Sequence, residues 1–214
     1  MNDFVTILKN ETAEIVEKKS KFIANICYVE NVEEAELKIK EIKKRYYDAK
    51  HNCVAYRVIE NGQIVEKASD DREPSGTAGG PMLNILQKNN LCNLIVVVTR
   101  YFGGILLGTG GLVRAYSDAT IKAIEKCEKI TKTKGIEVEV KLDYTNLDIF
   151  KYYCKNNNIN INKIDYSENV IIKIEMEKNR KDAFLKDIEI KNLKIEEYHV
   201  VKEKYIKKNV KTSQ

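Results

Sequence analysis

Residues 93–99 (NLIVVVT) constrain the fold more than any other segment of this 214-residue chain. The segment is a run of apolar, mostly β-branched residues, which favours a strand. A strand that is apolar on both of its faces has to be covered on both sides. The sequence therefore predicts a sheet that is covered on both faces at this strand.

A glycine-rich loop and a helix follow the strand. Residues 100–111 (RYFGGILLGTGG) are predicted to form the loop, and residues 112–127 the helix. Apolar and small residues recur along one face of that helix and are expected to point inward: Leu112, Ala115, Ala119, Ala123 and Cys127. This strand–loop–helix unit is the strongest physical feature of the sequence.

The first elements are indicated by periodicity. Apolar residues alternate with others over 22–28, as in a strand. Asn31 stands before Glu34 as an N-cap stands before the third helical residue, so a helix is predicted to open there. Apolar residues then recur at helical spacing up to Tyr46, which predicts one buried stripe.

Two further strands are predicted before the central one. Residues 51–59 and 63–69 are joined by Asn61-Gly62, a dipeptide typical of a hairpin turn. An acidic, glycine-rich loop over 70–80 leads to a short helix with Pro81 in its first turn.

The pattern of elements restarts after residue 134. The predicted order is a strand at 135–144, a helix at 145–157, strands at 161–166 and 169–176, a helix at 180–189 and a strand at 194–205. This β-α-β-β-α-β order is that of a ferredoxin-like unit. We therefore expect an α+β protein with two domains, 1–134 and 135–214, whose last residues, 207–214, fray.

Composition bears mainly on the compartment. Five cysteines without a CxxC pair indicate reduced thiols, and two histidines argue against a structural zinc site. The N-terminus lacks the features of a signal peptide, and the longest apolar run is too short to cross a bilayer. We therefore expect a cytoplasmic protein without a membrane span. The net charge of +5 is spread along the chain and does not by itself indicate nucleic acid.

Glycine and arginine are concentrated in the middle of the chain. Nine of the ten glycines lie between residues 62 and 111, and four of the six arginines lie within 51–116, a stretch with only two lysines. These arginines are Arg57, Arg72, Arg100 and Arg114. A guanidinium fork suits phosphate as well as carboxylate. Each arginine could therefore contact a ligand or brace a loop.

The glycine loop predicts an anion site. A helix that begins near Gly111 leaves its first N–H groups unpaired, and its dipole favours negative charge there. The loop is neither a Walker A motif nor a GxGxxG motif, and it could instead only permit a tight crossover. The candidate anion or nucleic-acid contacts are Arg57, Ser75, Gly76, Thr77, Arg100, Gly103, Gly104, Gly108, Thr109, Gly110, Gly111 and Arg114.

Supporting roles fall to residues around these loops. Asp70, Asp71 and Glu73 could hold magnesium with a phosphate ligand, or form salt bridges to the arginines. His51 and Cys53 share one face of a strand, which allows either a Cys–His nucleophile pair or a loop-bracing His beside a buried Cys. Four aromatic residues could stack on bases or belong to the core: Tyr56, Tyr101, Phe102 and Tyr116.

Three blocks resemble the signature of the YigZ/IMPACT family: HNCVAYR (51–57), SDDREPSGTAGGPML (69–83) and NLIVVVTRYFGGILLGTGGLVRAYSDA (93–119). The resemblance covers about 18–128, and the second half resembles the small C-terminal domain of bacterial members. It implies a first domain like ribosomal-protein S5 domain 2 and a ferredoxin-like second domain, a pairing similar to the last two domains of elongation factor G. It also implies a link to translation.

The chain departs from the family pattern at two positions. The family usually has glycine where this chain has Arg72, and a basic residue where this chain has Gly80. We expect a binding protein that contacts RNA, a ribosome or a translation factor, and a phosphate-type anion, through the 51–116 face. No catalytic residue, metal or cofactor is assigned, and the oligomeric state is left open. The alternatives are an enzyme acting on a phosphorylated small molecule and a protein-only adaptor.

Overall fold

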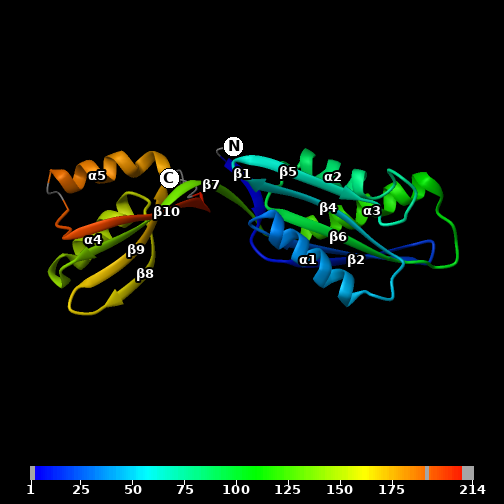
Figure 1. Cartoon of the computed structure of the whole chain (residues 1–214), viewed down its shortest axis with the longest axis horizontal. Helices are drawn as coiled ribbons and strands as arrows, with labels where there is room; N and C mark the ends of the chain where they lie inside the picture. The colour runs from blue at the N-terminus through cyan, green and yellow to red at the C-terminus, as the bar shows by residue number, and fades with distance from the viewer. Residues whose placement is uncertain (1–2, 191–192, 209–214) are drawn as a thin grey trace. The chain divides into compact units, whose positions relative to one another are not determined.

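The computed structural model describes residues 3–190 and 193–208 and contains two compact units (Figure 1). The first unit is Asp3–Ile130, and the second begins at Thr131. Most of the tail predicted to fray, 209–214, lies outside the described residues. Among the described residues, no helix combines the length and the apolar character that crossing a membrane requires.

The first unit is built on one five-stranded sheet in which all neighbouring strands are antiparallel. Its order is β2-β3-β6-β4-β5. The strands are β2 (Glu11–Glu17), β3 (Ser20–Tyr28), β6 (Leu94–Tyr101), β4 (His51–Glu60) and β5 (Gln63–Ser69). The apolar run at 94–98 therefore lies in the middle strand of the sheet.

Helices cover both faces of this sheet, as Figure 1 shows. Val96 and Val98 of β6 belong to the core beneath α2 (Gly79–Lys88) and α3 (Gly108–Lys126), whereas Ile95 and Val97 belong to the core beneath α1 (Val32–Arg45). Burying such a side chain stabilises the fold by roughly 1.5–3 kcal/mol. The prediction of a strand covered on both faces is confirmed.

Local signals explain where the helices of the first unit begin. Asn31 accepts a hydrogen bond from the Glu34 N–H at 2.8 Å, which confirms the predicted cap of α1. Pro81 lies in the first turn of α2, as predicted. The start predicted for α3 is wrong, because this helix begins at Gly108 and its first turn includes Gly110 and Gly111.

Two strands near the N-terminus were not predicted. They are β1 (Asp3–Ile7) and β2, which forms a hairpin with β3 through the two-residue turn Lys18-Lys19. Both lysines have positive φ angles, 45° and 65°, as a type I′ turn requires. Because such turns favour Asn-Gly, the sequence gives no signal for this hairpin.

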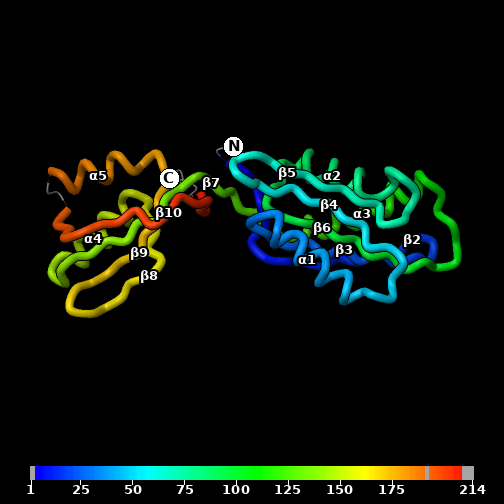
Figure 2. The backbone as a smooth tube through the Cα atoms, viewed as in Figure 1, coloured from blue at the N-terminus to red at the C-terminus, as the bar shows by residue number. Residues whose placement is uncertain are grey.

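The second unit has the predicted β-α-β-β-α-β order. Its elements are β7 (Lys129–Leu142), α4 (Leu147–Asn156), β8 (Asn160–Tyr166), β9 (Val170–Glu177), α5 (Lys181–Glu189) and β10 (Glu197–Lys207), with short 3-10 turns at Tyr144–Asn146 and Lys178–Arg180. The strands are ordered β10-β7-β9-β8 (Figure 2), which is the ferredoxin-like arrangement. The strand predicted to start at 135 begins six residues earlier.

Candidate functional site

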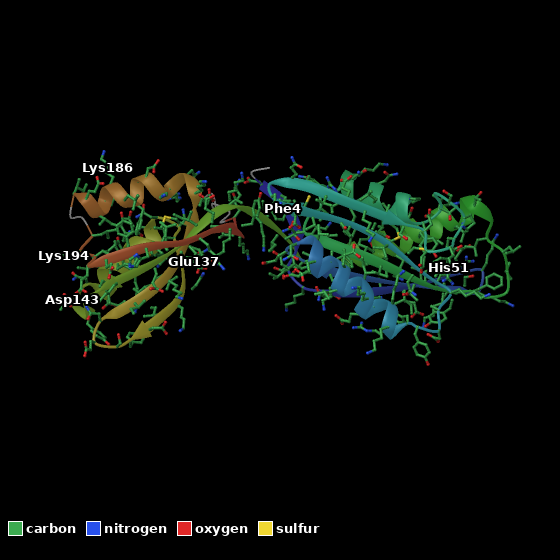
Figure 3. The ribbon with its side chains drawn as sticks, in the orientation of Figure 1. Phe4, His51, Glu137, Asp143, Lys186 and Lys194 are labelled. Carbon is green, nitrogen blue, oxygen red and sulfur yellow. The ribbon has the colours of Figure 1, made fainter. Side chains whose placement is uncertain are left out.

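The candidate residues gather where β4 begins and β6 ends. His51, the first residue of β4, lies opposite Arg100 in the sheet register, and Figure 3 marks its position in the first unit. The acidic loop and the glycine loop meet the same end of the sheet, because the acidic-loop residue Glu73 contacts both Arg100 and Tyr116 of α3. We call this region the loop end.

A buried polar centre lies at the core of the loop end and consists of Glu73, Arg100 and Tyr116. Arg100 Nη1 donates to Glu73 Oε1 at 2.7 Å, and the Tyr116 hydroxyl donates to the same oxygen at 2.9 Å. Arg100 Nη2 reaches Ser20 Oγ at 3.5 Å. Glu73 is 8% exposed and Arg100 6%. Such a pair stabilises the fold most when its remaining groups are also bonded, and here one buried donor, Arg100 Nε, has no hydrogen-bond partner among the described residues.

Aromatic rings enclose this centre. Phe22 packs edge-on against Tyr116, and the Arg100 guanidinium lies over the rings of Phe22 and Phe102 at 5.4 and 5.6 Å. Burial and the neighbouring Cys53 and Glu73 raise the pKa of Tyr116 far above its usual value. Arg100 thus braces the acidic loop, which was one of the two alternatives, and its fork is not available to a ligand in solvent.

Asp70 organises the acidic loop through its backbone. Its carboxylate accepts hydrogen bonds from the N–H groups of Gly76, Ala78 and Gly79 at 2.8–3.0 Å. Burial acts to raise the pKa of Asp70, but these three bonds outweigh it and hold the pKa below its usual value. Asp70 therefore closes the loop and satisfies free donors at the start of α2. Thr77 is buried and donates to the Pro74 carbonyl.

The other acidic residue of the pair points elsewhere. Asp71 accepts from the Asn52 N–H at 2.7 Å and pairs with Lys43 at 2.9 Å. His51 Nδ1 lies 2.9 Å from the Asp71 carbonyl, so His51 braces the loop. The carboxylates diverge and form internal contacts, which agrees with the salt-bridge alternative rather than the magnesium alternative, and the described residues contain no group of three or more potential metal ligands.

The Cys–His nucleophile is not supported. Cys53 is buried, and its thiol lies 3.0 Å from the Asp70 carbonyl. Burial, the largest cause, raises the pKa of Cys53 to about 12, so the thiolate is not populated near neutral pH. His51 contacts the acidic loop instead. The structure agrees with the other alternative, in which Cys53 is buried and His51 braces the loop.

Two predicted residues lie apart from the loop end. Arg57, six residues along β4 from His51, donates to Glu66 at 2.7 Å and to the Leu91 carbonyl at 3.2 Å. It is 8% exposed and braces the opposite end of the sheet. Tyr56 is buried in the core beneath α1, with Lys67 over its ring. Neither residue is placed to contact a ligand at the loop end.

The glycine loop is held against the β2–β3 turn at one glycine. A Cβ atom on Gly103 would lie 2.0 Å from the Lys19 backbone, so no other residue fits there. Beyond it the loop is open: Gly104 has a φ of 85°, and Leu106 is 82% exposed. No side chain caps the N-terminus of α3, and open space surrounds the Cβ position of Gly110.

Four exposed cations surround the polar centre, and we call them the rim. They are Lys18, Lys19, Arg72 and Arg114. Within the described ranges, none of the four forms an ion pair with an acidic side chain. The φ angle of Arg72 is 72°, a region that favours glycine. A glycine, which the family resemblance led us to expect at this position, would adopt this conformation without the strain that it imposes on Arg72.

Sequence reasoning missed the lysines of the rim. Lys18 and Lys19 lie outside the 51–116 window and stand in a lysine-rich stretch that resembles the rest of the chain. Ser75 and Gly76 are exposed on the acidic loop, and Gly108 and Thr109 are exposed in the first turn of α3. The exposed groups of the loop end therefore come from three separate segments.

Comparisons with known proteins agree with this architecture. The Impact N-terminal domain matches residues 18–124, and a domain of unknown function, DUF1949, matches residues 140–189. The IMPACT family member YvyE of Bacillus subtilis is 39% identical over 184 residues, which cover 86% of this chain and 84% of that protein. This chain belongs to the IMPACT family.

Two further relatives extend the comparison. YigZ, an IMPACT family member of Escherichia coli, is 34% identical over 163 residues, covering 74% of this chain and 78% of that protein. A crystal structure described only as that of a hypothetical protein aligns with a TM-score of 0.64 and 28% identity, covering 94% of this chain and 98% of the other. The family and the two-unit fold expected from the sequence are confirmed.

Proposed function

We propose that this IMPACT-family protein binds RNA of the translation machinery through the loop end of its first unit, and that the binding is not coupled to catalysis. The observation that carries the proposal is the separation of charges at the loop end. The carboxylates of the acidic loop and the Cys53 thiol are used internally, whereas the cations of the rim are exposed and form no ion pair within the described residues. Exposed cations of this kind supply most of the affinity for a phosphate backbone.

The backbone of the rim supports a role beyond folding. Lys18, Lys19 and Arg72 all adopt positive φ angles, which cost a non-glycine residue about 1 kcal/mol or more each. Lysine and arginine at these strained positions are better explained if their positive charge has a function. The uncapped first turn of α3 adds N–H groups that suit a phosphate oxygen.

Exposed apolar side chains add a second kind of contact. Phe102 is 51% exposed and Leu106 82%, and both belong to the loop that carries Gly103 and Gly104. An exposed aromatic ring near cations is the arrangement on which single-stranded bases stack. The family resemblance points toward translation, which favours RNA over DNA as the polymer.

The enzyme alternative fits the geometry less well. Glu73 and Tyr116 are bonded to each other and buried, and the thiol of Cys53 is protonated at neutral pH. The loop before α3 also offers no lysine to a phosphate. A small phosphorylated substrate would therefore meet few groups able to transfer a proton or a phosphoryl group.

Two measurements on the full chain test the proposal. Fluorescence anisotropy with a labelled single-stranded RNA should show binding that weakens steeply between about 50 and 200 mM salt. Arg72→Ala and Arg114→Ala should each weaken it, whereas Lys88→Ala, a matched control at the far end of α2, should not. Absent or salt-insensitive RNA binding, together with thermal stabilisation by a nucleotide and magnesium, would favour the enzyme instead.

A further inference from the structure

A groove beside the first turn of α3 adds a pocket to the rim. It has a volume of about 360 Å³ and is lined by residues of β2, the β2–β3 turn, the end of the glycine loop and α3. Its less exposed lining is apolar: Leu107 and Ala115 are buried, and Ile15 is half-buried. The volume lies within the range of small-ligand sites, about 300–1,000 Å³.

The charged lining of the groove is mixed. Lys18 and Arg114 belong to the rim, but Glu17 and Asp118 line the same groove. Both carboxylates are exposed, and neither pairs with a basic side chain in the part of the chain that the structure describes. Carboxylates repel phosphate, so they weaken a purely electrostatic site. Their presence calls for a ligand that also offers hydrogen-bond donors.

We infer that the groove binds an unstacked guanine base of the RNA; the inference rests on the proposed function. A carboxylate only accepts hydrogen bonds. The Watson–Crick edge of guanine places two donors, N1–H and the N2 amino group, side by side. Adenine and cytosine place a ring acceptor beside their amino group, and uracil has a single N–H between two carbonyls. A carboxylate in the groove therefore matches guanine best.

The rest of the lining agrees with a base in this position. The apolar residues Ile15, Leu107 and Ala115 suit the faces of a planar ring, while Lys18 and Arg114 can neutralise the flanking phosphates. Recognition of single-stranded RNA commonly combines such splayed bases with hydrogen bonds to their Watson–Crick edges. The groove would thus add base preference to an otherwise sequence-tolerant rim.

The experiment compares three labelled octamers on the full-length protein: all uridine, uridine with one central guanosine, and uridine with one central inosine, which lacks the N2 amino group. We expect the guanosine octamer to bind about tenfold more tightly than the all-uridine octamer, and inosine to lose most of that gain. Glu17→Gln or Asp118→Asn should abolish the preference while leaving salt-dependent binding to uridine equal or stronger. Glu125→Gln, elsewhere on α3, is the matched control.

The possible failures are distinguishable. Equal, salt-dependent binding of all three octamers would overturn the guanine pocket and leave the RNA-binding rim intact. A preference that survives both carboxylate variants would place guanine elsewhere and also overturn the inference. Absence of binding to any octamer would refute the proposed function, and the inference with it.

Discussion

Arg100 lies near the end of β6 and Arg114 in the second turn of α3, and their surroundings differ in almost every respect. Arg100 is buried, paired with Glu73 and enclosed by aromatic rings, whereas Arg114 is exposed on the first turns of α3 and lines an open groove. The same residue type therefore holds the fold together at one position and is offered to solvent at the other. The polar centre stabilises the loop end, and the rim forms the exposed surface around it.

The strongest way to test this division is to break the polar centre. Arg100→Ala leaves the Glu73 carboxylate buried without its charge partner, so the free energy of unfolding should fall by about 3–5 kcal/mol. Urea unfolding measures the loss. Arg45→Ala, which breaks the exposed pair with Glu41, is the control and should cost only about 0.3–0.5 kcal/mol. A loss of under 1 kcal/mol for Arg100→Ala would contradict this stabilising role.

Replacing Asp70 should lower the stability by a smaller amount, and this loss should depend on pH. Asp70→Asn removes the charge that three N–H groups stabilise, and we expect it to cost about 1–3 kcal/mol near neutral pH. Because the folded pKa of Asp70 is depressed, its contribution is present above the unfolded pKa and is lost as the pH falls through the folded value.

The pH dependence of Asp70→Asn follows from that sign. Wild type should lose stability on acidification below about pH 4, and the variant should lose less because it has no carboxyl group at this position to protonate. Urea unfolding of both proteins over that range measures the difference. Parallel losses would show that Asp70 is not the group responsible.

Substitutions in the rim should raise the stability of the fold, whereas those in the polar centre and at Asp70 lower it. Replacing Lys18-Lys19 by Asn-Gly matches the type I′ turn and should raise the free energy of unfolding by about 1 kcal/mol. Arg72→Gly should stabilise by a similar amount, because it relieves a φ of 72°. Both variants should at the same time weaken RNA binding. Destabilisation by either would show that these side chains contribute to the fold.

The outcome for the rim also shows what sequence reasoning can reach. The central strand and the ferredoxin-like unit were predictable, because apolar periodicity records burial directly. The start of α3 was not, because Gly108, Gly110 and Gly111 are typical of a loop, whereas in the structure they belong to the first turn of the helix, before the buried Leu112. The prediction therefore missed the first four residues of the helix, 108–111.

The candidate site was only partly predictable for a related reason. Four arginines in one segment indicate that arginine has a role there. They do not indicate which of the four side chains are buried and which are exposed. Arg57 meets Glu66 through the register of β4 and β5, and Arg100 meets Glu73 of the acidic loop, so both contacts depend on the fold rather than on local sequence. Lys18 and Lys19 lie at the site because Gly103, which has no side chain, lets their turn pack closely against the glycine loop. This contact joins segments that are more than 80 residues apart in the sequence.

The most direct measurement of the central claim is the salt dependence of RNA binding by the rim. The logarithm of the association constant, plotted against the logarithm of the salt concentration, has a slope that counts neutralised phosphates, about 0.7 for each on a single strand. Wild type should have a steep slope, and a variant lacking Lys18, Lys19, Arg72 and Arg114 should lose up to about three units of it. Tyr116→Phe, in the polar centre, should keep the wild-type slope. An unchanged slope in the rim variant, or a lowered one in Tyr116→Phe, would contradict the account.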